Sequence, residues 1–203
     1  QDAVSGRYAL GPAALRIGLT CLHQLDPMRA AEPVIHELAA TTGHAVALAV
    51  WGNFGPTVVR LIEARQPLHV ALRVGSVMSI FDTATGRAFA ATLPRERLAE
   101  AVAGPNGDLV SRNVLLERDG EIDQIRAESA RHGVCRAAGR PIPGVNAFSA
   151  AAFDHEGTPV LVVTALDHVD RLSSNWNGAT AQAVRDAARR ISQRLGFQEP
   201  ARN

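Results

Sequence analysis

Two stretches of the sequence define the predicted fold. They are residues 74–93, VGSVMSIFDTATGRAFAATL, and residues 143–166, PGVNAFSAAAFDHEGTPVLVVTAL. The first stretch predicts the end of a strand, a turn, and a helix of small side chains that begins near Thr83. The second predicts a β-hairpin, because two runs of strand-forming residues flank the turn residues 154–157. The return strand, residues 160–166, is apolar on both faces, so both faces need a cover. Helices can cover one face, and helices or a ligand held under a loop can cover the other.

The rest of the chain is organised around these stretches as alternating groups of helices and strands. Apolar residues at three- and four-residue spacing predict helices over residues 12–25, 27–42, 83–93, 94–103, 121–132 and 176–195. Runs of strand-forming residues predict strands over residues 45–51, 57–63, 68–74, 134–138, 145–153 and 159–166. Residues 104–108 predict a loop. This order predicts an α+β fold, in which helices flank an antiparallel sheet of five or six strands.

The composition narrows the class of protein. A chain of 203 residues holds one sizeable domain or two small ones. The formal net charge is +1 and no basic stripe is present, so this stretch gives no electrostatic reason to bind nucleic acid. Two cysteines are too few for a disulfide framework. With no apolar run of membrane-spanning length and no signal-like start, we expect a cytoplasmic protein with no membrane partner.

The start of the helix near Thr83 suggests a place for an anion. Asp82 or Thr83 is suited to cap the helix, and the next residues, including Ala84 and Thr85, are small. A helix start offers unpaired backbone N–H groups and the positive end of a dipole, which together favour a carboxylate. The same small residues could instead allow close packing of the helix on the sheet. The residues alone leave both interpretations open.

The two quoted stretches resemble the effector-binding half of IclR-family transcriptional regulators, and the resemblance extends over residues 8–195. It implies a GAF- or PAS-like sheet, with a small-molecule effector held between the helix start, a loop and the C-terminal strands. It places the backbone amides of Ala84 and Thr85 against the ligand. Side chains on the strands are then expected to line the same cup, namely Ala137, Ala147, Thr164 and Leu166, with Val145 and Asn146 beside them.

This chain departs from the family pattern in the polarity of those positions. Family members commonly carry several polar side chains there, whereas alanine and leucine predominate here and Thr85 and Thr164 are the polar exceptions. Smaller and less polar side chains leave a larger and more apolar cup. We therefore predict an aromatic or alicyclic carboxylate, rather than an acid of two or three carbons, as the ligand.

The resemblance also predicts how the chain is divided. Residues 1–25 correspond to the end of a winged-helix wing and a linker helix, residues 26–197 to the effector-binding domain, and residues 198–203 to a tail. The DNA-reading domain of the family is expected to be missing from this chain, so operator DNA would be bound only through that missing domain. The family further implies a homodimer or a homotetramer.

Two other functions compete with a ligand sensor: a small enzyme on a GAF-like fold, and a pure dimerisation module with a solid core. An enzyme needs a nucleophile or an acid–base pair, and Cys135 is predicted to be a buried, inert thiol. The acidic and histidine groups at residues 154–156 and 167–170 are predicted to be solvated turn residues rather than metal ligands. We expect no catalytic residue, no metal and no cofactor. Arg73 and Arg136 are assigned to the surface.

Overall fold

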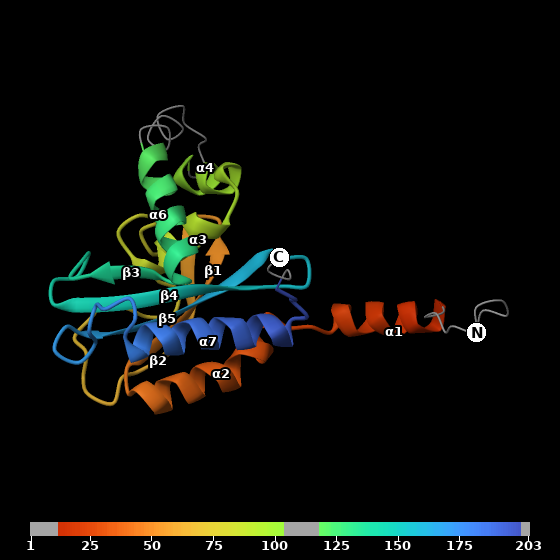
Figure 1. Cartoon of the computed structure of the whole chain (residues 1–203), viewed down its shortest axis with the longest axis horizontal. Helices are drawn as coiled ribbons and strands as arrows, with labels where there is room; N and C mark the ends of the chain where they lie inside the picture. The colour runs from red at the N-terminus through yellow and green to blue at the C-terminus, as the bar shows by residue number, and fades with distance from the viewer. Residues whose placement is uncertain (1–11, 104–117, 200–203) are drawn as a thin grey trace.

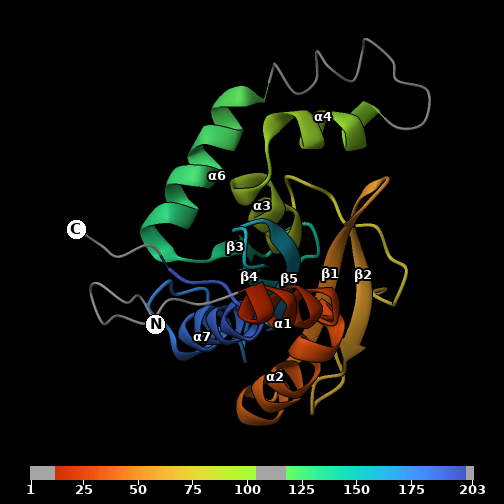
Figure 2. The same ribbon diagram turned by 90° about the vertical axis from the view of Figure 1, so that its right-hand side faces the viewer.

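The computed structural model describes residues 12–103 and 118–199, and these form three layers with a five-stranded antiparallel sheet in the middle (Figure 1). Helices α2 and α7 cover one face of the sheet, and helices α3, α4 and α6 lie on the other side (Figure 2). Helix α1 extends away from this body. The helices are α1 Pro12–His23, α2 Pro27–Thr42, α3 Ala84–Thr92, α4 Arg95–Ala103, α6 Asp119–His132 and α7 Ala179–Arg194. The strands are β1 Ala45–Gly52, β2 Gly55–Ile62, β3 Cys135–Ala138, β4 Val145–Phe153 and β5 Pro159–His168.

The helix ends follow the local signals in the sequence. The Asp26 side chain accepts hydrogen bonds from the backbone N–H groups of Met28 and Arg29, and Pro27 opens helix α2. Gly43 ends the same helix with a φ of 74°, a left-handed conformation that glycine adopts without steric cost. The predicted loop at residues 104–108 and the part of the chain before residue 12 lie outside the described residues.

The sheet has the strand order β2-β1-β5-β4-β3, and every neighbouring pair is antiparallel. The predicted hairpin is confirmed as β4 and β5, with Ala147 opposite Leu166 and Ser149 opposite Thr164. Strand β1 pairs with the other edge of β5, which places Ala47 opposite Thr164. The α+β class predicted from the sequence is therefore confirmed, with five strands.

The predicted strand at residues 68–74 is wrong. This segment is extended, but it joins no ladder, and the only bridge nearby joins Thr57 to Val77. Leu68, Val70 and Leu72 do share one half-buried side, which packs onto the face of the sheet instead of entering the sheet. A two-residue period reports that one side of an extended chain is buried, and it carries no information on whether the backbone is paired.

Three apolar clusters divide the interior. One lies between the sheet and helices α2 and α7, and another lies between the opposite face and helices α3, α4 and α6. The third is small: Ala45, Val145 and Leu166 of the sheet lie under the extended residues 64–72. The second face of the sheet is thus covered partly by helices and partly by an extended segment, and the beginning of helix α3 lies next to that segment.

Candidate ligand-binding site

A hollow of about 50 Å³, here called the α3 hollow, lies between the start of helix α3 and the sheet. Seven of the eight residues that the sequence analysis selected line it, namely Ala84, Thr85, Ala137, Val145, Ala147, Thr164 and Leu166. The floor includes small side chains, because Ala47 of β1, Ala147 of β4 and Ala137 of β3 lie on this face of the sheet. The site residues are therefore brought together, while their contact with a ligand stays a prediction.

Asn146, the eighth selected residue, does not line the α3 hollow. Successive side chains of a strand point to opposite faces, so Asn146 faces away from its neighbours Val145 and Ala147. Its side-chain N–H donates to the carbonyl oxygen of Leu172 at 2.7 Å, and its side-chain oxygen accepts the N–H of Gly139 at 3.1 Å. Asn146 thus ties together the chain segments that follow β3 and β5, which corrects its assignment as a ligand-binding neighbour.

The beginning of helix α3 is fixed by two close contacts. The Thr83 hydroxyl accepts the N–H of Gly86 at 3.0 Å and donates to the carbonyl oxygen of Ser79 at 2.7 Å. Within the described residues, the backbone N–H groups of Ala84 and Thr85 have no hydrogen-bond partner. Both residues are buried and line the α3 hollow. Two unpaired donors at the positive end of a helix dipole are therefore next to the hollow.

Three buried hydroxyls form a chain along the wall of the hollow. Thr164 Oγ1 lies 2.9 Å from Thr85 Oγ1 and 2.7 Å from Ser149 Oγ. Three hydroxyl protons serve these two hydrogen bonds, so one proton is left over. An unused proton on Ser149, which is fully buried, would be an unsatisfied donor, so the favoured arrangements leave it on Thr85 or Thr164. Both threonines line the hollow, so the remaining proton is next to any ligand held there.

A cation at the rim was missed by sequence reasoning. Arg140 follows β3 and lines the α3 hollow together with Pro141 and Ile142, and it has no ion pair or hydrogen-bond partner within the described residues. Leu72 and Met78 close the hollow from the extended segment before helix α3. No periodicity or spacing singles out Arg140, because it approaches the hollow only through the pairing of β3 with β4.

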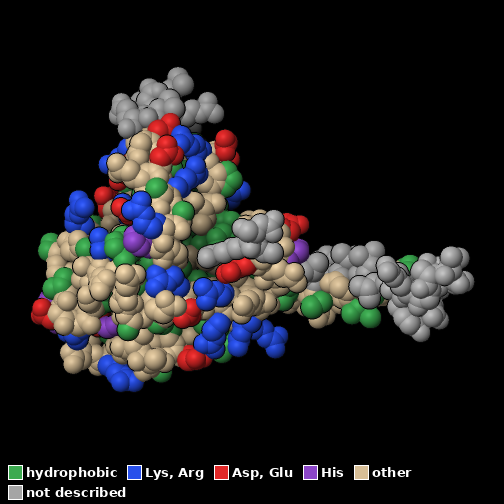
Figure 3. Space-filling view, viewed as in Figure 1, with side chains coloured by type: hydrophobic (Ala, Val, Ile, Leu, Met, Phe, Trp, Pro, Cys, Tyr) green, Lys and Arg blue, Asp and Glu red, His purple; other side chains and the backbone are tan. Residues whose placement is uncertain are grey.

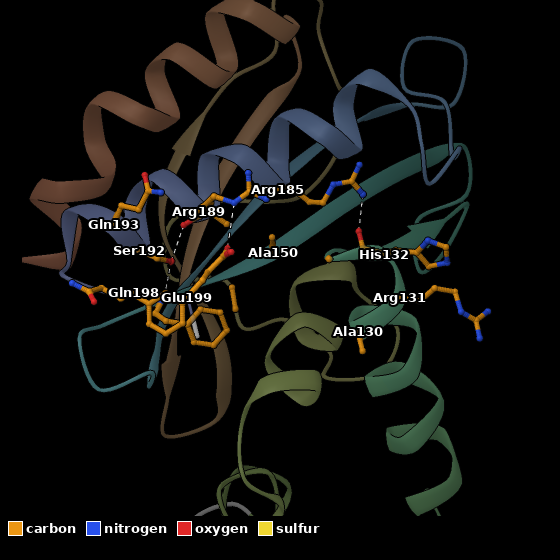
Figure 4. Close-up of a pocket in the computed structure, with 15 residues that line it drawn as sticks. Ala130, Arg131, His132, Ala150, Arg185, Arg189, Ser192, Gln193, Gln198 and Glu199 are labelled. Carbon is orange, nitrogen blue, oxygen red and sulfur yellow. Dashed lines mark hydrogen bonds and ion pairs between the residues drawn. The ribbon is translucent and has the colours of Figure 1, made fainter. Parts of the chain in front are cut away.

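A larger cleft of about 620 Å³ lies between the end of helix α6 and helix α7, and Figure 3 shows this hollowed surface with basic side chains nearby. Two of its three arginines, Arg185 and Arg189, are already engaged, and the side chain of the third, Arg131, points away from them (Figure 4). Arg185 of α7 donates to the His132 carbonyl oxygen at 2.6 Å, at the end of α6. Arg189 pairs with Asp186 at 3.0 Å and Glu199 at 3.3 Å. These bonds join α6, α7 and the tail, so the α3 hollow, with its unused donors, is the better candidate for a ligand site.

Cys135 does not contribute a nucleophile. Burial raises the pKa of its thiol to about 11, so almost no reactive thiolate is present at neutral pH. We expect one thiol, the exposed Cys21, to react with a disulfide reagent in the folded protein, and two to react after unfolding in denaturant. Absorbance of the released thiol measures both numbers. Fast reaction of two thiols in the folded protein would contradict the buried position of Cys135.

A second correction concerns Asp167, which the sequence analysis placed in a solvated turn. It lies in β5 and is only 2% exposed. Its carboxylate accepts Arg171 Nε at 2.9 Å and lies 2.9 Å from Nδ1 of His44, whose Nε2 is 3.1 Å from the Thr180 hydroxyl. Burial alone would raise the pKa of Asp167, but the hydrogen bonds from Arg171, His44 and the His168 backbone together lower it.

Within the described residues there is no group of three or more acidic, histidine or cysteine side chains that could hold a metal ion. No described helix combines the length and the apolar character that crossing a bilayer requires. What the described part of the chain does contain is a sheet with a small hollow beside a helix start. This combination is that of an effector-binding domain.

The chain belongs to the IclR family of bacterial transcriptional regulators. Residues 19–193 match the family described as "Bacterial transcriptional regulator IclR C-terminal". The crystal structure of Pseudomonas aeruginosa HmgR is similar with a TM-score of 0.85 and 31% identity, over 98% of this chain and 79% of that chain. The chain is also 23% identical to the HTH-type transcriptional repressor AllR of Salmonella paratyphi A, over 98% of its own length and 73% of AllR.

The Thermotoga maritima IclR structure shares the fold, with a TM-score of 0.69 and 20% identity over 94% of this chain and 77% of that chain. The chain is thus the effector-binding domain of an IclR-type regulator, and it is not an enzyme. IclR-family regulators bind small-molecule effectors. The resemblance inferred from residues 74–93 and 143–166 is confirmed at the level of the family.

Proposed function

We propose that this domain senses a small apolar carboxylic acid, aromatic or alicyclic, in the α3 hollow. One observation carries the proposal: residues with unused hydrogen-bond donors line a hollow whose other walls are apolar. The backbone N–H groups of Ala84 and Thr85, a surplus proton of the threonine pair and the Arg140 guanidinium all suit a carboxylate. Alanine, leucine, valine and isoleucine side chains on the remaining walls suit a hydrocarbon body.

Binding requires the α3 hollow to open. Its volume of about 50 Å³ is far below the roughly 300–1,000 Å³ of ordinary ligand pockets. The walls that can move are the two segments outside the sheet, around Leu72 and around Ile142, because neither is held by a strand ladder. A bound acid displaces these two segments. The shape of the domain therefore differs between the occupied and the empty α3 hollow.

The central test uses a panel of acids and two variants. We expect benzoate and cyclohexanecarboxylate to raise the melting temperature of the domain and to bind saturably in calorimetry, whereas pyruvate does neither. Thr85→Val keeps the volume and removes the hydroxyl, so it should weaken binding about 5- to 20-fold through the lost charge-assisted hydrogen bond. Thr92→Val is the matched control, since the Thr92 hydroxyl bonds only its own helix.

Two outcomes would contradict this proposal. Stabilisation by pyruvate and by no aromatic or alicyclic acid would overturn the predicted ligand class. Equal loss of affinity in Thr85→Val and Thr92→Val would show that the Thr85 hydroxyl has no specific part in binding. A solid dimerisation module, in contrast, predicts no saturable binding by any acid.

The wider organisation of the protein is part of the same proposal. Residues 26–197 act as the sensing unit, residues 1–25 lead into it from a DNA-reading domain, and the protein works as a homodimer or a homotetramer on operator DNA. The formal net charge of +1 supports the view that this chain has little affinity for DNA by itself. Tight binding of bulk DNA by this chain at moderate salt, measured by gel shift, would contradict it.

A further inference from the structure

A second compartment of about 200 Å³ lies beside the α3 hollow, under the extended segment that follows β2. Most of its lining side chains are apolar: Ala64, Leu68 and Val70 belong to the extended segment, and Leu61 and Ala45 belong to strands β2 and β1. Glu63 is the one charged side chain among the described residues that line it. This compartment is therefore a second space for the apolar part of a ligand, and its volume is larger than that of the α3 hollow.

The two spaces share two walls. Leu72 and Leu166 line both the α3 hollow and the second compartment. Leu166 is buried in β5, where it is held on both sides by β1 and β4. Leu72 is half-buried on the extended segment, which has no ladder to hold it. Of the two side chains that separate the spaces, only Leu72 can therefore move without breaking the sheet.

From this arrangement we infer that the effector is a carboxylic acid with an extended apolar end, such as an arylalkanoic or medium-chain acid, which displaces Leu72 and fills both spaces. The inference rests on the proposed function of the α3 hollow. The carboxylate lies at the start of helix α3, and the apolar end lies against Ala64 and Leu68. The α3 hollow, at about 50 Å³, cannot enclose such an acid without the neighbouring 200 Å³.

The segment at residues 64–72 also accounts for how the second compartment opens. Its contacts with the sheet are the apolar side chains of the third cluster, and a hydrocarbon chain can replace such contacts at little cost because they have no directional requirement. Burial of methylene groups then supplies affinity at about fourfold for each group added. The number of methylenes that continue to add affinity measures the depth of the second compartment.

The experiment measures dissociation constants by calorimetry for benzoate, phenylacetate, 3-phenylpropionate and 4-phenylbutyrate. For the unchanged chain we expect affinity to rise about two- to fourfold per methylene. Ala64→Phe fills the second compartment, so it should abolish this rise while leaving benzoate binding within about twofold. His69→Phe is the matched control, because His69 is exposed in the same segment and lines neither space.

Leu72→Ala provides a second, independent variant. It removes the movable wall, so it should strengthen binding of 4-phenylbutyrate at least threefold relative to benzoate. If benzoate binds but affinity is flat or falls along the series, or if Ala64→Phe leaves the rise unchanged, the second compartment is not used and the inference is overturned. If no acid of any length binds, the proposed function itself fails.

Discussion

Replacing Gly86 with alanine is expected to lower the free energy of unfolding by about 3 kcal/mol or more. A Cβ at this position would lie 2.1 Å from the carbonyl oxygen of Ser79 and 2.5 Å from the Cα of Ile80. Both are backbone atoms, so no side chain can rotate away to make room. The melting temperature should fall by roughly 6–12 °C, which calorimetry or circular dichroism measures directly.

Gly120→Ala is the matched control for this prediction. Gly120 lies near the start of helix α6, and an added Cβ would meet nothing within 4 Å. The exchange should be neutral or stabilise the protein by up to about 1 kcal/mol, because alanine loses less backbone entropy in a helix than glycine. A Gly86→Ala protein as stable as the Gly120→Ala protein would contradict the close approach of helix α3 to residues 79–80.

The Gly86 contact also matters for the site. It holds the turn before helix α3 against the helix, next to the Thr83 cap that leaves the N–H groups of Ala84 and Thr85 unpaired. Any variant of Gly86 that folds should therefore also bind the acids of the panel more weakly, because a Cβ at 2.1 Å from the Ser79 oxygen forces the turn to shift until the two atoms are at least 3.0 Å apart. The geometry of the helix start and the stability of the fold therefore depend on the same contact.

Asp167→Asn is expected to lower the free energy of unfolding by about 2–4 kcal/mol at neutral pH. The exchange removes the negative charge that is buried between Arg171 and His44, at 2.9 Å from each. Asparagine can accept fewer of these hydrogen bonds, and it cannot balance the Arg171 charge. Urea unfolding at pH 7 measures the difference.

The effect of Asp167→Asn should depend on pH with a definite sign. The folded state lowers the pKa of the Asp167 carboxyl, so the ionised form stabilises the fold. That stabilisation is fully present above the unfolded-state pKa of about 3.9 and is lost as the pH falls through the lower folded-state pKa. The stability difference between the two proteins should therefore shrink as the pH falls below about 4.

Asp170→Asn is the control for the same exchange on the surface. The Asp170 side chain is 82% exposed and pairs only with His168, so its replacement should change stability by less than about 0.5 kcal/mol. A loss of less than 1 kcal/mol in Asp167→Asn, or a stability difference that grows as the pH falls, would contradict the buried ion pair as the source of the stabilisation.

Local signals in the sequence define the ends of helix α2 and the hairpin. The Asp26–Pro27 pair and Gly43 mark both ends of helix α2, and two runs of strand-forming residues, 145–153 and 159–166, flank the turn residues 154–157. Caps and turns depend on residues a few positions apart, so the chain encodes them directly. The same locality explains why Asp82 or Thr83 could be identified as a cap, and the structure assigns the cap to Thr83. The selection of Ala84 and Thr85 as ligand contacts rests on the resemblance to the IclR family.

Which surfaces these elements contact depends on how the whole chain packs. Residues 68–74 cover the sheet instead of joining it as a strand, and Asn146 faces away from the α3 hollow. Asp167 is buried between His44 and Arg171, and Arg140 lies at the rim of the hollow. These outcomes depend on contacts between residues tens of positions apart. A periodic pattern states which side of an element is buried, but the partner that buries it is fixed only when strands pair and layers pack.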